Sequence, residues 1–242
     1  MFPIQWSKEG LTLALAGVDY NLRGQKEPIA YQESLEAMKN SLQGNVEQVY
    51  TCQQTHSSRV VRVDGKVATD FMGYPQFEET DGLMTSEKGQ ALLVKFADCT
   101  PVVLYDPVKR ALAVVHSGWR GTQQRISLEA IRLMGKEVGS KRGDLFAYIG
   151  PCIDPKIYEV DQPVYEAFKD FPSRDEFFLA KNEPGKYFLQ MAHANKIILK
   201  EAGLKEEQIS SCKESTYTDP RLHSARKEGP SYGLNGLLVM MV

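Results

Sequence analysis

The sequence has few of the residues that build metal-rich or disulfide-stapled proteins. Its 242 residues include four histidines and four cysteines. Cys52, Cys99, Cys152 and Cys212 lie about 50 residues apart, with no C-x-x-C pair and no cluster. This spacing excludes a disulfide scaffold and a zinc ribbon. A cysteine that takes part in chemistry must therefore meet its partners through the fold.

An excess of charge of one sign and a long apolar run are also absent. The net charge is −2, so no bulk field attracts nucleic acid or an anionic membrane. No apolar run approaches the roughly 20 residues that a spanning helix needs. The opening MFPIQWSKEG lacks a basic region followed by an apolar one. We therefore expect a cytoplasmic protein whose partners are neither nucleic acid nor membrane.

The pattern of apolar residues predicts a mixed α/β fold in one domain, residues 1–242. There is no internal repeat, linker or low-complexity tract, and strands mix with helices without strict βαβ alternation. This favours a layered α/β (α+β) arrangement with mixed sheets over a doubly wound parallel sheet. Helices are predicted over 31–42, from an N-cap at Thr122 to 138, over 162–171 and over 189–202. Strands are predicted over 11–20, 47–52, 59–64, 91–96, 145–149, 157–160, 211–217 and 237–242. Loops are predicted over 68–88 and 173–186.

The stretch 96–121, FADCTPVVLYDPVKRALAVVHSGWRG, is predicted to form a β-hairpin. Its two apolar runs flank Asp106 and a proline, which presets φ while the aspartate can bond the backbone ahead of it. In an antiparallel pair closed there, paired residue numbers add to about 216, within one or two. Thr100 then lies opposite about His116, with Cys99 beside it. A thiol and an imidazole should thus emerge together at one end of two strands.

His56, Cys99 and His116 form a candidate metal site, which His56 joins only if its loop lies beside this hairpin end. Two imidazoles and a thiolate suit Zn²⁺ and leave a fourth position for water or substrate. Copper(I) also accepts this donor set. An alternative needs no metal: Cys99 is a nucleophile and His116 its base, as in cysteine hydrolases. The bland alternative is a hydrogen-bonded histidine at a strand end beside a buried thiol.

Four charged residues are candidates for binding substrate or phosphate. Arg120 lies in SGWRG, a glycine-containing turn before a helix, where backbone and guanidinium can hold an anion. Arg59 is a second anion candidate. Asp81 and Asp98 can orient a histidine, bind ribose hydroxyls or cap a turn. A purely structural role is an open alternative for each of the four.

Five motifs resemble, in order, those of the YfiH/YlmD family of bacterial purine nucleoside phosphorylases, formerly described as multicopper polyphenol oxidases or laccases. They are QTH at 54–56, TDGL at 80–83, ADCTP at 97–101, VHSGWRG at 115–121 and IGPCI at 149–153. The resemblance extends over nearly the whole chain, and it implies an α/β/β/α sandwich shared with a group of proposed cysteine hydrolases. The sequence departs from the family at Gln190, Lys227 and Leu234, where the family often has aspartate, arginine and arginine.

The family's metal ligands correspond to His56, Cys99 and His116. The resemblance therefore implies a zinc-dependent enzyme that phosphorolyses adenosine, inosine, guanosine and methylthioadenosine and that deaminates adenosine. Its partners would be a purine nucleoside and phosphate, and its state a monomer or small homo-oligomer. We expect Arg59 or Arg120 to help hold the phosphate while the metal polarises the base.

Two other classes of function compete with this one. A copper-dependent phenol oxidase would use the same two histidines and cysteine. A multicopper oxidase, however, also needs a trinuclear cluster, which four histidines cannot supply. A non-catalytic metal-binding scaffold would hold the ion and turn nothing over, so saturable turnover of adenosine separates it from an enzyme.

Overall fold

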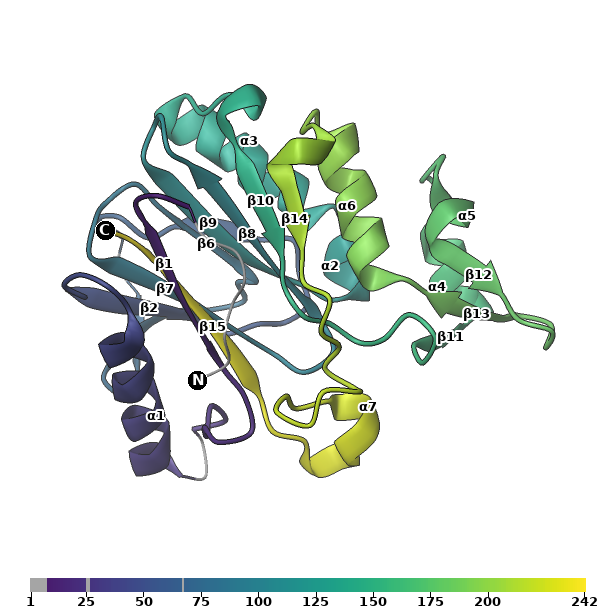
Figure 1. Ribbon diagram of the computed structural model, residues 1–242, viewed down its shortest axis with the longest axis horizontal. Helices are drawn as coiled ribbons and strands as arrows, with labels where there is room; N and C mark the ends of the chain where they lie inside the picture. The colour runs from purple at the N-terminus through teal and green to yellow at the C-terminus, as the bar shows by residue number, and fades with distance from the viewer. Residues whose placement is uncertain (1–7, 25–26, 67) are drawn as a thin grey trace.

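Two six-stranded sheets form the centre of the fold (Figure 1). The structure, a computed structural model, describes residues 8–24, 27–66 and 68–242. The first sheet contains β1 (Leu11–Ala16), β2 (Gln48–Cys52), β4 (Thr69–Phe71), β5 (Tyr74–Phe77), β7 (Gln90–Phe96) and β15 (Asn235–Met241). The second contains β3 (Val60–Arg62), β6 (Gly82–Thr85), β8 (Thr100–Asp106), β9 (Ala111–Ser117), β10 (Phe146–Ile149) and β14 (Ile209–Ser211). The strand orders are β1-β15-β7-β2-β5-β4 and β14-β10-β8-β9-β6-β3, and both sheets mix parallel with antiparallel neighbours.

The two sheets stack face to face, and alternate residues of one strand enter different cores. In β7, Leu92 and Val94 lie in the core between the sheets, whereas Ala91 and Leu93 pack beneath α1 (Pro28–Ser41). A strand that is buried on both faces needs a continuous apolar run instead of an alternating one. This explains the run ALLV at the start of the segment.

Helices cover the outer face of the second sheet as well. α3 (Ile126–Val138) packs Ile126, Ala130 and Met134 in one core with residues of β8 and β9, and α6 (Met191–Glu201) lies beside α3. These three side chains are spaced four residues apart and so form one stripe of the helix. The order helix, sheet, sheet, helix confirms the α/β/β/α sandwich expected from the sequence (Figure 1).

A small third sheet extends beyond the sandwich at the right of Figure 1. It contains β11 (Glu159–Asp161), β12 (Phe178–Ala180) and β13 (Lys186–Leu189), with α4 (Gln162–Ala167) and α5 (Arg174–Phe177) beside it. The segment 173–186 was predicted as a loop because it is charged. It folds into α5 and β12 because Phe177 and Phe178 are buried with Phe168 in a separate aromatic core.

Three further predictions about single elements are wrong. The predicted loop 68–88 contains β4, β5 and β6, which are too short to show a period. Thr122 does not cap a helix: it lies inside α2 (Trp119–Gln123), whose cap is Gly118. The predicted strand 211–217 ends as β14 at Ser211, and beyond it the chain forms an isolated bridge at Ser215 before α7 (Ala225–Glu228).

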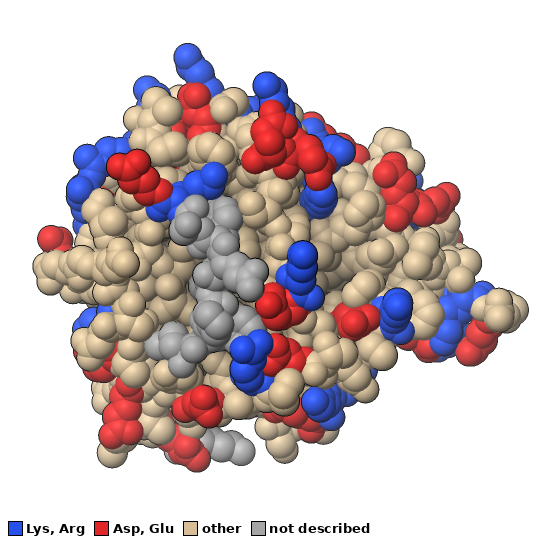
Figure 2. Space-filling model, viewed as in Figure 1, with Lys and Arg blue, Asp and Glu red and all other residues tan. Residues whose placement is uncertain are grey.

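The surface and the helices bear on possible partners. Figure 2 shows acidic and basic side chains interspersed over the face viewed. None of the helices within the described ranges is both long enough and apolar enough to cross a bilayer.

Candidate metal centre

The β8–β9 hairpin brings Cys99 and His116 to one end of the second sheet. Its register pairs Thr100 with Ser117, one residue from the predicted partner and within the stated tolerance. The Asp106 carboxylate accepts two backbone N–H groups of the turn, each at 2.9 Å. The turn that the sequence predicts therefore sets which residues emerge together.

His56 joins this pair from a loop that follows β2 of the first sheet. Its backbone is left-handed, with φ at 62°. The donor atoms of His56, Cys99 and His116 all lie within 4.8 Å of one another. The two imidazole rings have centroids 5.0 Å apart and meet edge to face. The structure thus brings together the three side chains of the predicted metal site.

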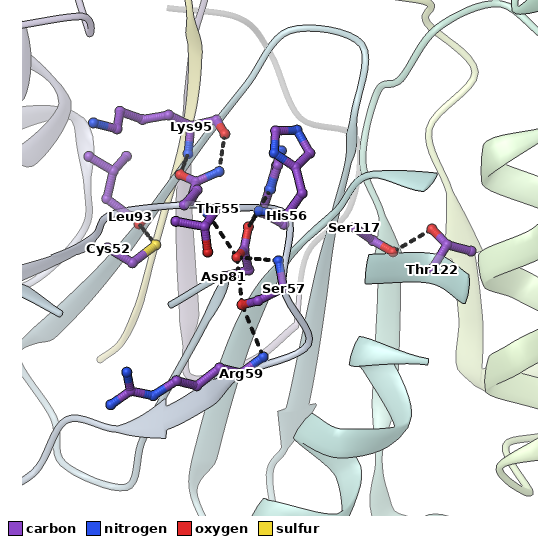
Figure 3. Close-up of polar contacts among 12 residues, drawn as sticks. Cys52, Thr55, His56, Ser57, Arg59, Asp81, Leu93, Lys95, Ser117 and Thr122 are labelled. Carbon is purple, nitrogen blue, oxygen red and sulfur yellow. Dashed lines mark hydrogen bonds and ion pairs between the residues drawn. The ribbon is translucent and has the colours of Figure 1, made fainter. Parts of the chain in front are cut away.

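Asp81, buried just before β6, ties the His56 loop to the hairpin. One of its carboxylate oxygens contacts His116 Nδ1 at 2.9 Å and accepts the backbone N–H of His56 at 3.0 Å. The other accepts the N–H groups of Thr55 and Ser57 and the Ser57 hydroxyl. Figure 3 shows this carboxylate at the centre of the loop. Asp81 therefore orients a histidine, one of the roles considered from the sequence.

Protonation of the site is set by the charges that the fold encloses. Burial raises the pKa of the Cys99 thiol, but His116 and His56 outweigh burial and lower that pKa to about 6. Burial lowers the pKa of His116, but Cys99 and Asp81 outweigh it and raise that pKa to about 9. In the metal-free protein, both shifts favour a thiolate beside an imidazolium. Metal binding would displace the proton from the imidazole nitrogen that faces the thiolate.

Gly118 leaves the space in which the donors meet. A Cβ at this position would lie 2.8 Å from Cδ2 of His56 and 3.0 Å from Sγ of Cys99. Contacts this short require the imidazole and the sulfur to move apart. The glycine that follows the His-Ser pair in the SGWRG segment is therefore needed for the approach of His56 to Cys99.

The chemistry of these donors fits zinc or copper(I). Both ions take imidazole nitrogen and thiolate sulfur, and three protein donors leave one position free on zinc. The carboxylate behind His116 is the outer-shell partner that metal-binding histidines commonly have. Across the described ranges, no second group of three metal-ligating side chains comes together. His223 contacts Glu228 at 3.0 Å and His193 lies on α6, so the described residues offer no trinuclear copper site.

A cavity of about 440 Å³ opens beside the three donors, and all three line it. Its walls also carry aromatic side chains, among them Phe71, Phe96 and Tyr232. Glutamine amides contribute hydrogen-bonding groups. A concave site with aromatic walls and a few polar groups is what a flat heterocyclic ligand needs.

The two arginines predicted to hold phosphate lie outside this cavity lining. Arg59 donates from Nη1 to the carbonyl of Glu78 at 3.0 Å, and its side chain points away from His56 (Figure 3). The Arg120 guanidinium lies over the Trp119 ring, 4.3 Å from the centroid. Their phosphate role stays a prediction, and it requires phosphate to approach from outside the cavity.

Asp98 is occupied by protein groups. Its backbone is left-handed, with φ at 84°, directly before Cys99. One carboxylate oxygen accepts the Thr216 hydroxyl and the other accepts the backbone N–H of Arg226, each at 2.7 Å. These bonds hold the turn that presents Cys99, which is the turn-forming role considered from the sequence.

Sequence reasoning missed two cations that line the cavity, Lys95 and Arg23. Lys95 had a signal, because it is the one charge in the apolar run 91–96 of a central strand. Arg23 had none, since it sits in a polar loop. Arg23 lies over the Tyr232 ring at 4.3 Å from the centroid, across a long stretch of sequence.

Two stacked mixed sheets between helices, with a His–Cys–His cluster at one edge, define an α/β/β/α protein with a candidate metal centre. The chain belongs to the family described as multi-copper polyphenol oxidoreductase laccase, whose model matches residues 12–242. This is the YfiH family that the sequence motifs indicated.

Named relatives of the chain are enzymes of purine nucleosides. Purine nucleoside phosphorylase YlmD of Bacillus subtilis is 36% identical over 180 residues, 72% of this chain and 64% of that protein. A purine nucleoside phosphorylase of Bacteroides thetaiotaomicron is 35% identical over 166 residues, 66% and 60% of the two chains. Adenosine deaminase RL5 of an unknown prokaryotic organism is 31% identical over 189 residues, 74% and 70%. The chain thus spans just under two thirds of the first two relatives.

Solved structures share the fold. The Bacillus licheniformis hypothetical protein YfiH superimposes with a TM-score of 0.85 at 26% identity, over 91% of this chain and 84% of that one. YlmD from Geobacillus stearothermophilus also has a TM-score of 0.85, at 23% identity, over 96% and 92% of the two chains.

Proposed function

We propose that the chain is a zinc-dependent purine nucleoside phosphorylase that also deaminates adenosine. Its substrates would be adenosine, inosine, guanosine and methylthioadenosine, which phosphate converts to the free base and the corresponding ribose 1-phosphate. One observation carries the proposal: His56, Cys99 and His116 converge on the wall of a cavity with aromatic sides. The names of the relatives support the choice of substrate.

The donor trio would hold the metal, which supplies Lewis acidity toward a ligand atom in the cavity. Asp81 keeps His116 Nδ1 engaged, so that the other ring nitrogen faces the Cys99 sulfur. The aromatic walls would hold the purine by stacking and exclude water from it. Arg59 and Arg120 are the phosphate ligands proposed from the sequence. If either acts so, its replacement by alanine raises KM for phosphate and leaves KM for inosine unchanged.

The decisive experiment combines product analysis with metal analysis. Wild-type protein is incubated with inosine with and without phosphate, and zinc is measured in the same preparation. We expect hypoxanthine and ribose 1-phosphate only with phosphate. Cys99→Ala should lose both zinc and turnover, whereas Cys212→Ala, a half-buried cysteine outside the donor set, should keep both.

Two results would refute this proposal. Hypoxanthine release that ignores phosphate would identify a hydrolase in place of a phosphorylase. Equal zinc content in wild type and Cys99→Ala would show that Cys99 is not a zinc ligand and would refute the proposed metal site. Saturable deamination of adenosine would exclude a non-catalytic scaffold.

A cysteine hydrolase is the second candidate, because Asp81, His116 and Cys99 form a carboxylate–imidazole–thiolate series. This series has the order of orienting group, base and nucleophile. The two candidates separate on removal of the metal by a chelator. A hydrolase should keep cleaving an ester or amide and should lose that activity in Cys99→Ser, while a metal-dependent phosphorylase should stop.

A copper-dependent phenol oxidase is a third candidate, because the family's description names a polyphenol oxidoreductase. The donor set would accept copper(I). Copper bound at one ion per chain, with oxygen uptake on a phenol, would favour this candidate.

A further inference from the structure

The cavity carries two positively charged side chains whose presence the metal donors do not explain. Lys95 and Arg23 line it, and the described residues contribute no Asp or Glu to its walls. Neither side chain has a carboxylate within 4.0 Å among the residues that the structure describes. A neighbouring cavity that shares Arg23 contains three acidic residues. Of these two cavities, only the one beside the metal donors has no acidic side chain among the described residues of its walls.

Lys95 is held in place while its charge stays unpaired. Its backbone N–H donates to Oε1 of Gln54 at 2.8 Å and its carbonyl accepts Nε2 of the same amide at 2.6 Å. Its ammonium lies 5.3 Å from the centroid of Phe71 and 5.7 Å from that of Tyr31. Burial lowers the pKa of Lys95. Ring faces offset part of the lost hydration, and a bound anion would offset the remainder.

The ammonium and the metal donors occupy different parts of the same cavity. Figure 3 shows the Lys95 side chain extending away from the His56 ring, while both residues line the cavity. Phe71, whose ring lies next to the Lys95 ammonium, also lines this cavity. A ligand that fills the cavity would place one polar group at the donors and an anionic group at Lys95.

We propose that Lys95, assisted by Arg23, binds a phosphate group at the end of the cavity away from the metal donors. The proposal rests on the proposed function, in which phosphate is a reactant. Inorganic phosphate and the 5′-phosphate of a purine nucleotide share this chemistry. The subsite differs from the one predicted from the sequence, because Arg59 and Arg120 do not line the cavity.

The test measures binding instead of turnover, with zinc-loaded protein in a calorimeter. Lys95→Met removes the charge and keeps the length of the side chain, and Lys95→Arg keeps the charge. Lys8→Met is the matched control, because the Lys8 ammonium also lies over a ring, that of Phe146 at 3.6 Å, outside the cavity. The probes are inorganic phosphate and inosine 5′-monophosphate.

We expect Lys95→Met to weaken at least one probe by about tenfold or more, with Lys95→Arg within about threefold of wild type and Lys8→Met unchanged. Loss confined to inorganic phosphate, with a matching rise in its KM, assigns the site to the reactant. Loss confined to the nucleotide, with inosine binding unchanged, assigns it to a 5′-phosphate. Arg23→Ala should weaken the same probe to a smaller degree.

Wild-type affinity for both probes in a folded Lys95→Met protein would overturn the proposal, as would a wild type that binds neither. If Lys95→Met does not fold, Arg23→Ala decides by the same measurements, and wild-type affinity of Arg23→Ala for both probes would then overturn the proposal. A protein that binds phosphate through Lys95 but does not phosphorolyse inosine would refute the proposed function and support the subsite.

Discussion

Replacement of Asp81 by asparagine tests the reasoning behind the metal centre most directly. The carboxylate serves five groups: His116 Nδ1, three successive backbone N–H groups at 55–57 and the Ser57 hydroxyl. An amide has one oxygen and an NH₂ in place of the second, so several of these donors lose their acceptor. We expect Asp81→Asn to destabilise the metal-free protein by about 3–5 kcal/mol, the range for a buried charged group that loses its partner.

The size of this effect can be compared with the acid titration of the same group. Burial raises the pKa of Asp81, yet the bonds from His116 and Ser57 lower it from 3.8 to about 2. That difference corresponds to about 2 kcal/mol at neutral pH. Because the folded pKa is depressed, the contribution is present above about pH 4 and is lost as pH falls toward 2. The difference in the free energy of unfolding between wild type and Asp81→Asn should therefore become smaller as the pH falls from about 4 toward 2.

The assay is urea unfolding of chelator-treated protein, followed by a chelator competition for zinc. Asp81→Asn should lose about 10–100-fold in zinc affinity, since outer-shell carboxylates orient metal-binding histidines. Asp64→Asn is the matched control, because its carboxylate also holds a turn, through Arg62 and Ser86, away from the donors. The control should lose stability and keep its zinc affinity. An Asp81→Asn protein with the stability and zinc affinity of wild type would refute the reasoning.

Two further predictions concern the donors. Gly118→Ala should weaken zinc binding by about tenfold or more, because its Cβ would press on His56 and Cys99. Gly143→Ala is the control and should bind zinc normally, since a Cβ there meets nothing within 4 Å. Chelator competition measures both variants, and equal zinc affinities would contradict the packing argument. In metal-free protein, the rate at which iodoacetamide alkylates Cys99 should rise with pH, with a midpoint near the thiol pKa of about 6. His116→Ala should move this midpoint to higher pH. Mass spectrometry measures the rate, and a rate that does not change between pH 5 and 8 would contradict the prediction.

The hairpin could be predicted because its register depends on a local turn. Asp106 and the proline after it determine where the chain reverses, and this places Cys99 near His116. The chemistry of the three side chains made His56 a candidate ligand on the condition that its loop lies beside the hairpin end, and the family resemblance pointed to the same residue. Its position depends on Asp81, a contact across 25 residues that no periodicity reveals.

The anion-binding residues could not be chosen from the sequence, because the direction of a long side chain is a property of the tertiary structure. Arg59 and Arg120 lie close in sequence to the metal donors but engage a carbonyl and an indole ring outside the cavity. Lys95 sits in a strand that the apolar pattern correctly predicted, yet the pattern does not show which lysine faces a cavity. The short strands between 68 and 88 were missed for a related reason: three or four residues carry too little pattern.

His56 follows a strand of one sheet, while Cys99 precedes β8 and His116 lies in β9 of the other. An ion held by all three would cross-link the two layers of the sandwich at their shared edge. Depletion of that ion would remove this cross-link and leave the layers joined by the apolar core between the sheets and by the hydrogen bonds of Asp81. The survival of the protein against proteases would then depend on how much metal the medium supplies.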